Sequence, residues 1–298
     1  MRVTLGAVAI SLALTSALAA EDRLTLALGD GSLIHYTLDR PAGEAAGLLV
    51  IAQGSGCIPG AANPAMGQVR AAFADYTALI VEKIGITPDA DIVDGDLDCP
   101  QEFIERYALS QRVDDYLLVL ESLVQDDSFG DRLVLFGGSE GGLAVARLAG
   151  EIAPDATIIL SSATGPNFGD MVKATVPPEA HPHFDAVFAE ARANPESDTP
   201  FGGSTYRFWA DIIDMSTAEL MLRSDSPFLL IQGGRDVSNP LALAWATVDA
   251  YAQSGKCGLT YWEFPALDHG MRREDGASRL AEVMALAAQW AEKPSPSC

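Results

Sequence analysis

Five short runs of uninterrupted apolar residues constrain the fold of this chain most strongly. They lie at 47–52, 79–81, 133–136, 157–160 and 228–231. A strand that is covered on both faces needs no alternation of polar and apolar residues, so such runs are typical of central strands in a parallel sheet. Helical patterns lie between the runs, for example at 113–124. The sequence therefore predicts an α/β fold with a mostly parallel central sheet and helices on both faces.

Two segments depart from this alternation. Residues 23–28 and 32–38 flank a Gly-Asp-Gly turn, which predicts an antiparallel hairpin at the N-terminal edge of the sheet. From about 163 to 226 the chain becomes polar and proline-containing, with helical patches at 184–193 and 206–223. We expect this segment to fold over the sheet as a cap insertion within a single domain of residues 20–298. Asn239 and Pro240 predict the next helix start, with a capping side chain.

Residues 1–19 have the pattern of a cleavable signal peptide. Arg2 precedes a short, mostly apolar run that ends at Leu18, and Ala17-Leu18-Ala19 fits a small-x-small cleavage site. The run falls short of the ~20 apolar residues that a transmembrane helix needs. The sequence therefore predicts a secreted or periplasmic protein with no membrane span in the mature chain.

Secretion changes the interpretation of the four cysteines. An even number of cysteines in an oxidising compartment predicts disulfides. Of the three possible pairings, the expected topology favours Cys57–Cys99 and Cys257–Cys298. There is no Cys-x-x-Cys motif or Cys/His cluster, so the sequence offers no thiolate zinc site. We expect no metal and no cofactor.

The net charge limits the kinds of partner and substrate that the protein can bind. The chain has 19 Lys and Arg against 41 Asp and Glu, a formal net charge of −22. Such a surface repels phosphate backbones and slows the approach of anionic substrates, which argues against nucleic acid as a partner. Five aspartates within 89–98 form an acidic loop whose spacing does not match the helix–loop–helix calcium pattern. A solvated acidic loop and a calcium site both stay open.

A glycine-rich motif contains the strongest candidate for a catalytic residue. Gly137-Gly138-Ser139-Glu140-Gly141-Gly142 follows the run 133–136 and precedes a helix-compatible stretch. In such a strand–turn–helix junction a serine projects its hydroxyl above the sheet, and glycines let the neighbouring backbone pass closely. The pattern therefore favours a nucleophilic serine. The alternative is a phosphate-binding turn, although the longer dinucleotide and P-loop patterns are absent.

With this motif the sequence resembles the α/β-hydrolase superfamily of serine hydrolases over about residues 44–290, with distant similarity to prolyl-oligopeptidase and dienelactone-hydrolase types. The resemblance implies an acid after a later strand and a histidine after the last one. Asp236 follows the run 228–231, and His269 follows a candidate strand at 261–264. His269 would take the proton of Ser139, and Asp236 would orient the imidazole. Asp268 is the competing acid, but as the neighbour of His269 it should point elsewhere.

The same resemblance implies two N–H donors for the oxyanion. One is the backbone N–H of Glu140, and the other comes from the loop after the first apolar run, with Ser55 as first candidate and Gly54 as second. The cap aromatics Phe201, Tyr206 and Trp209 are candidates for the pocket wall, or they simply pack the cap onto the sheet. An apolar wall would favour uncharged esters.

These expectations describe a secreted serine hydrolase that cleaves small carboxylic esters through an acyl-enzyme intermediate, as a monomer or small homo-oligomer. A peptidase or an acyltransferase would use the same triad. A third hypothesis is a non-catalytic binding protein with a hydrolase fold.

Overall fold

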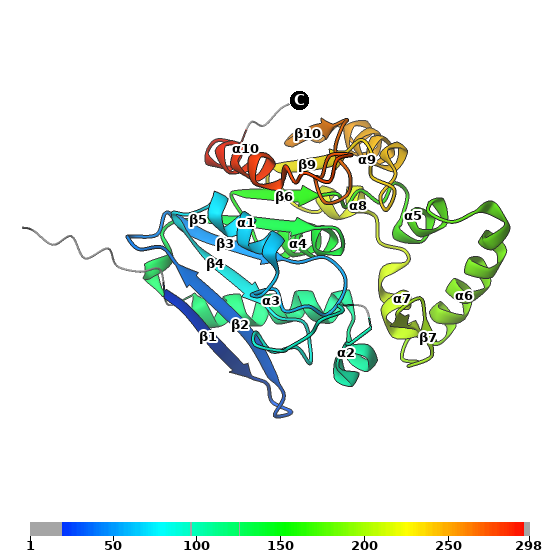
Figure 1. The fold of residues 1–298 in the computed structure, drawn as a ribbon, viewed down its shortest axis with the longest axis horizontal. Coiled ribbons are helices and arrows are strands. Elements are labelled where there is room, and N and C mark those ends of the chain that lie inside the picture. The colour runs from blue at the N-terminus through cyan, green and yellow to red at the C-terminus, as the bar shows by residue number, and fades with distance from the viewer. Residues whose placement is uncertain (1–19, 96, 125, 295–298) are drawn as a thin grey trace, which may run out of the picture.

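The computed structural model describes residues 20–294 except 96 and 125. An eight-stranded sheet forms its framework, in the order β1-β2-β4-β3-β5-β6-β9-β10 (Figure 1). The strands are β1 (Ala20–Ala27), β2 (Leu33–Arg40), β3 (Gly47–Ala52), β4 (Tyr76–Val81), β5 (Arg132–Gly138), β6 (Ala156–Leu160), β9 (Phe228–Gly233) and β10 (Leu259–Phe264). The pairs β1–β2 and β2–β4 are antiparallel, and the other five pairs are parallel.

The predicted apolar runs are the central strands of this sheet. Strand β3 shows why they do not alternate: Leu48 and Val50 pack into one hydrophobic core, whereas Leu49 and Ile51 pack into a second core on the opposite face. Both sets are buried, so every position of the strand is apolar. The predicted fold class, with the antiparallel hairpin at the N-terminal edge, is confirmed.

Helices cover both faces. They are α1 (Pro64–Ala72), α2 (Gln101–Arg106), α3 (Leu109–Leu123), α4 (Glu140–Glu151), α5 (Phe168–Ala174), α6 (His181–Ala193), α7 (Tyr206–Ile212), α8 (Thr217–Leu222), α9 (Leu241–Gln253) and α10 (Leu280–Glu292), with 3-10 turns η1 (Asp127–Phe129) and η2 (Pro178–Ala180). Helices α1 and α10 contribute to one core, and α3, α4, α8 and α9 contribute to the other. Helix α4 begins at Glu140, directly after the turn that contains Ser139.

The predicted capping role of Asn239 is wrong. Helix α9 begins at Leu241 without a side-chain cap. The buried Asn239 amide instead donates to the carbonyl of Ala163, at a distance of 3.2 Å, and so ties this turn to the segment after β6. A tertiary contact has replaced the local one.

Most of the segment between β6 and β9 projects beyond one end of the sheet, whereas its last helix, α8, packs against α4 and α9 (Figure 1). It contains α5 to α8 and the short hairpin β7 (Pro200–Phe201) and β8 (Ser204–Thr205). The helical patches predicted at 184–193 and 206–223 correspond to α6 and to α7 with α8. An aromatic cluster holds the projecting part together, since Phe201 packs edge-on against Phe184 and Trp209 with ring centroids 5.5 and 5.6 Å apart.

A disulfide joins Cys57 to Cys99, as predicted. It links the loop after β3 to the loop after β4, because these residues follow those two strands. The second predicted pair includes Cys298, and the predicted signal peptide covers residues 1–19; both lie outside the described residues. Within the described part of the chain, no helix is long and apolar enough to cross a membrane.

Candidate active site

Ser139 occupies a strained turn between β5 and α4. Its φ of 53° and ψ of −126° fall in a region that residues with a Cβ rarely adopt. Two hydrogen bonds hold the turn: the Ser139 N–H donates to the carbonyl of Leu160 at 2.8 Å, and its carbonyl accepts from the N–H of Gly142 at 2.9 Å. The side chain stays partly exposed. Strain of this kind persists only where the surrounding structure enforces it, and it clusters at functional sites.

The glycines around Ser139 are explained by close backbone contacts. A Cβ placed on Gly137 would lie 2.1 Å from the carbonyl oxygen of Gly141, and a Cβ on Gly141 would lie 2.0 Å from the carbonyl oxygen of Ala52. Both distances are impossible for a carbon and an oxygen that are not bonded. The two glycines of the G-x-S-x-G pattern are therefore required because β5, α4 and β3 pack so closely beneath the serine.

The carboxylate of Asp236 is buried in a complete set of hydrogen bonds. Its Oδ1 accepts from the backbone N–H groups of Ser238 and Asn239 at 2.9 and 2.8 Å. Its Oδ2 accepts from the side-chain amide of Gln232 at 2.9 Å and lies 2.8 Å from Nδ1 of His269. A carboxylate only accepts, so Nδ1 carries the proton in this contact and Nε2 is left for another partner.

The competing acid, Asp268, has a different role. Its Oδ1 accepts from the N–H groups of Gly270 and Arg272 at 3.0 and 2.8 Å, so the side chain closes its own turn. Of the two aspartates weighed from the sequence, Asp236 is the one whose carboxylate contacts His269.

Ser139, Asp236 and His269 follow the carboxyl ends of β5, β9 and β10, which belong to one parallel set of strands and so share one rim of the sheet. The structure brings Asp236 and His269 into contact. Among the described residues, however, no hydrogen bond joins the Ser139 hydroxyl to His269. In enzymes without bound substrate such contacts are often long and tighten only in the complex.

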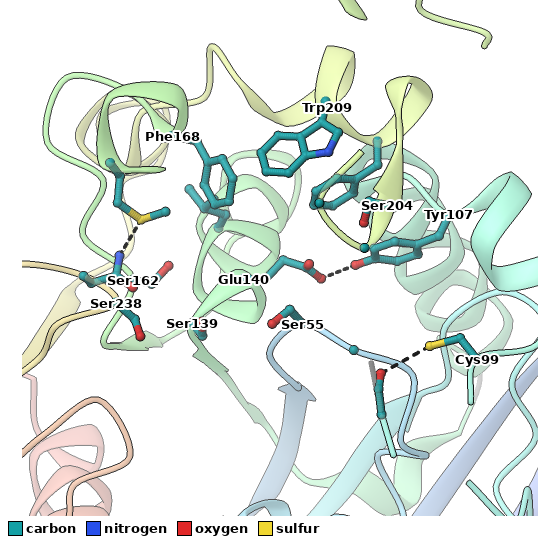
Figure 2. Close-up of a pocket in the computed structure, with 18 of the residues that line it drawn as sticks. Ser55, Cys99, Tyr107, Ser139, Glu140, Ser162, Phe168, Ser204, Trp209 and Ser238 are labelled. Carbon is teal, nitrogen blue, oxygen red and sulfur yellow. Dashed lines mark hydrogen bonds between the residues drawn. The ribbon is translucent and has the colours of Figure 1, made fainter. Parts of the chain in front are cut away.

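The loop after β3 passes directly beside Ser139. A Cβ on Gly54 would lie 3.2 Å from the Cβ of Ser139. Ser55 lines the same cavity as Ser139 and Glu140 (Figure 2). In the described chain, the backbone N–H groups of Gly54, Ser55 and Glu140 donate to no protein group. Three unpaired donors therefore accompany the serine, from the positions that the sequence proposed for an oxyanion hole.

A buried charge cluster next to Ser139 was not predicted from the sequence. One carboxylate oxygen of Glu140 accepts from Lys83 Nζ at 3.1 Å, from Arg112 Nη1 at 3.4 Å and from the hydroxyl of Tyr107. Burial alone would raise the pKa of Glu140, but the two cations and the hydroxyl outweigh it and hold this pKa below its usual value. Burial lowers the pKa of Lys83 to about 8, although Glu140 opposes the shift. Two positions in the sequence could have indicated this cluster: Lys83 lies just after the buried strand β4, and Arg112 lies next to the core residue Val113.

A cavity of about 520 Å³ opens above the serine. Figure 2 shows Phe168 and Trp209 on its upper side, opposite Glu140 and Ser139. Its other aromatic lining residues are Phe103, Tyr107 and Phe208. Among the described residues in this lining, Glu140 is the one with a charged side chain, and its charge is paired. The cavity is therefore fitted to an uncharged, partly apolar group.

The three pocket candidates from the cap differ in position. Trp209 lines the cavity, but Phe201 and Tyr206 are not part of its described lining. Both lie partly buried against the core, and the Phe201 carbonyl accepts a hydrogen bond from the indole N–H of Trp209 at 2.8 Å. Their packing role, the alternative considered for each, accounts for these two residues.

No cluster of three or more His, Cys, Asp or Glu side chains is arranged to hold a metal ion within the described residues. Asp96 of the acidic loop lies outside them.

Comparisons with known proteins extend this description. No protein-family model and no curated protein matches the chain. Among solved structures, Est1E from Butyrivibrio proteoclasticus is similar with a TM-score of 0.59 and 15% identity, over 91% of this chain and 98% of that one.

Two peptidases are similar over a part of their length. For a puromycin-hydrolyzing peptidase from Mycobacterium tuberculosis, the TM-score is 0.62 at 18% identity, with 94% of this chain and 39% of that chain covered. For the acylaminoacyl peptidase of Pyrococcus horikoshii, the values are 0.61 and 15%, over 95% and 42%. This chain therefore spans about two-fifths of each peptidase and nearly all of the esterase. At these identities the likeness concerns the fold, and the chain has the α/β-hydrolase fold.

Proposed function

We propose that the chain is a serine hydrolase that cleaves uncharged carboxylic esters, with Ser139 as nucleophile, His269 as general base and acid, and Asp236 as the residue that orients His269. The observation that carries this proposal is the 2.8 Å contact between His269 Nδ1 and the buried Asp236 carboxylate, at the rim where Ser139 occupies its strained turn. That contact leaves Nε2 as the proton acceptor that an unassisted serine lacks.

The reaction would proceed in two transfers. Ser139 Oγ attacks the ester carbonyl carbon while His269 takes the hydroxyl proton. The resulting oxyanion is stabilised by the N–H of Glu140 and by that of Ser55 or Gly54. Collapse of this intermediate breaks the bond to the alcohol, which leaves with the proton from His269. Water then attacks the acyl-enzyme with the same assistance and releases the carboxylic acid.

Two features support the substrate class. The aromatic cavity wall and the absence of a cation in its described lining favour a neutral acyl or alcohol group. The net charge of −22 slows the approach of anionic substrates. The proposal includes export, which the Cys57–Cys99 disulfide and the signal-peptide pattern of residues 1–19 support.

The direct test compares Ser139→Ala with a matched serine variant. Ser161 directly follows the neighbouring strand β6, has a φ of 50° and is buried, and its hydroxyl has no partner in the described chain. With short-chain nitrophenyl esters, we expect Ser139→Ala to lose at least about a thousandfold in kcat and Ser161→Ala to stay within about threefold. Undiminished hydrolysis by folded Ser139→Ala contradicts the proposal.

The same assay separates the other uses of this triad. Nitroanilide substrates report peptidase activity, and an added alcohol or amine that captures the acyl group reports transfer. Esters cleaved faster than anilides, with water as the main acceptor, are the expected result.

A further inference from the structure

Two buried cations fasten the loop after β3 to the interior. Lys83 Nζ donates to the carbonyls of Gly54 and Gly56 at 2.8 and 2.9 Å. Arg112 Nη1 donates to the carbonyl of Gln53 at 2.8 Å. The side chains of both cations are at most 1% exposed. Three carbonyls of one short loop therefore face the charge cluster that contains Glu140.

Peptide geometry carries this restraint to the other side of the loop. The chain has no cis peptide bonds in its described part, and in a planar trans peptide the N–H points opposite to the C=O. The carbonyls of Gln53 and Gly54 belong to the same peptide planes as the N–H groups of Gly54 and Ser55. These two N–H groups therefore point away from Arg112 and Lys83, and both are without a protein partner there.

The charge cluster also connects this loop to the nucleophile. Glu140 is the residue directly after Ser139 and begins α4. Its carboxylate pairs with the same Lys83 and Arg112 groups that hold the loop. One carboxylate thus links the two backbone segments from which the proposed oxyanion donors come.

Stability gives little reason for such a cluster. Burying ionised groups costs several kcal/mol each, and replacing a buried ion pair by apolar residues of similar size is often neutral or stabilising. The oxyanion hole, in contrast, needs donors that are fixed before the reaction starts. A cluster that fixes the peptide planes of the donor loop supplies that requirement.

We propose that Glu140 and Lys83 are positioning residues that hold the N–H groups of Gly54 and Ser55 in register with Ser139 for oxyanion stabilisation. This inference rests on the proposed serine-hydrolase function and adds to it a determinant of the rate. Glu140 keeps its backbone N–H, a proposed oxyanion donor, in any side-chain variant, and the side-chain pair touches no reacting atom. Its loss should therefore lower kcat and leave KM nearly unchanged, because the loop stabilises the transition state more than the bound ester.

The test uses Lys83→Met and Glu140→Gln, with Glu82→Gln as the matched control. Glu82 is a carboxylate of similar burial, 2% exposed, that accepts from the N–H groups of Gly60 and Ala61 at 2.8 and 3.1 Å. We expect kcat for a nitrophenyl ester to fall roughly tenfold to a hundredfold in Lys83→Met and in Glu140→Gln, with KM within about twofold. The control should show a lower Tm with kcat within about threefold.

A double-variant cycle distinguishes positioning from a general loss of structure. If Lys83 and Glu140 act as one unit, the double variant should be about as slow as the slower single variant, because the second change removes nothing further. Effects on kcat that multiply would contradict the proposal. The double variant leaves no charge at either position, so it keeps the test possible if a single variant does not fold.

The outcomes separate this inference from the proposed function. Wild-type hydrolysis that Ser139→Ala abolishes, together with unchanged kcat in folded Lys83→Met or Glu140→Gln, would overturn the positioning role alone. A folded wild-type protein that cleaves neither esters nor anilides would overturn the proposed function and this inference with it.

Discussion

The side-chain amide of Gln232 donates to Oδ2 of Asp236, the same oxygen that faces His269 Nδ1, at 2.9 Å. Gln232 lies in β9 and is fully buried. The same amide nitrogen of Gln232, Nε2, also donates to the carbonyl of Asn239 at 2.9 Å. A residue inside the sheet thus fixes the rotamer of the acid that orients the proposed base.

Gln232→Leu should therefore slow catalysis without affecting substrate binding. Losing this hydrogen bond lets the Asp236 carboxylate rotate, so the imidazole is held less well in the transition state. We expect kcat to fall about tenfold with KM unchanged in steady-state ester hydrolysis. A raised KM with an unchanged kcat would mean that Gln232 shapes the pocket instead.

Substitutions at two neighbouring glycines should have opposite results. A Cβ on Gly141 would meet the carbonyl oxygen of Ala52 at 2.0 Å, whereas the nearest atom to a Cβ on Gly138 is a ring carbon of Phe136 at 3.9 Å. Gly141→Ala should lower the free energy of unfolding by at least about 2 kcal/mol or prevent folding. Gly138→Ala should remain folded with a urea midpoint near the wild-type value. Equal midpoints for the two variants would contradict the close packing of α4 on β3.

The disulfide should contribute measurably to stability. Cys57 and Cys99 are 42 residues apart, and closing a loop of this length removes entropy worth about 2–4 kcal/mol from the unfolded chain. The double substitution Cys57→Ser and Cys99→Ser should lower the urea midpoint accordingly. It should also lower kcat, because the bridge restrains the loop beside Ser139. A non-reducing peptide map that finds free thiols at both positions would remove the basis of this prediction.

Asp115 should make the protein less stable as the pH rises. Burial in α3 raises the pKa of Asp115 to about 7, with a smaller contribution from the charge of Asp114. Between pH ~4 and ~7 the folded chain therefore holds a proton that the unfolded chain has lost, so the free energy of unfolding falls across that interval. The resulting penalty is fully present above pH 7.

Asp115→Asn should remove this penalty. At pH 8 we expect the variant to be more stable than wild type by on the order of 2 kcal/mol, and at pH 4 to be nearly equal to it. Glu121→Gln is the control, because Glu121 is exposed on the same helix and is not among the groups that shift the pKa of Asp115. Urea unfolding at both pH values provides the comparison. A stability difference that does not change with pH would show that Asp115 does not titrate in this range.

The fold and the candidate triad could be predicted because their signals are local. Strand β3 is an apolar run, and β6 and β9 are apolar except for Thr157 in β6 and Gln232 near the end of β9. The turn at Ser139 needs glycines within two residues of it. The Cys57–Cys99 bridge was also predicted, since both cysteines follow predicted strands.

Features that depend on distant segments could not be predicted. Lys83, Arg112 and Glu140 meet only after β4, α3 and α4 have packed together, and no spacing in the sequence records that meeting. The aromatic residues between β6 and β9 were also hard to assign from the sequence. Trp209 and Phe201 are both aromatic and adjacent in space, yet Trp209 lines the cavity and Phe201 packs behind it.

The central claim is that Ser139 is a nucleophile activated by His269, and covalent labelling tests it most directly. A fluorophosphonate reacts with an activated serine and leaves a stable adduct that peptide mass spectrometry assigns to one residue. We predict a single adduct on Ser139 in the wild-type protein and none in folded His269→Ala under the same conditions. A folded wild-type protein without an adduct, or with one on a different serine, would contradict the claim.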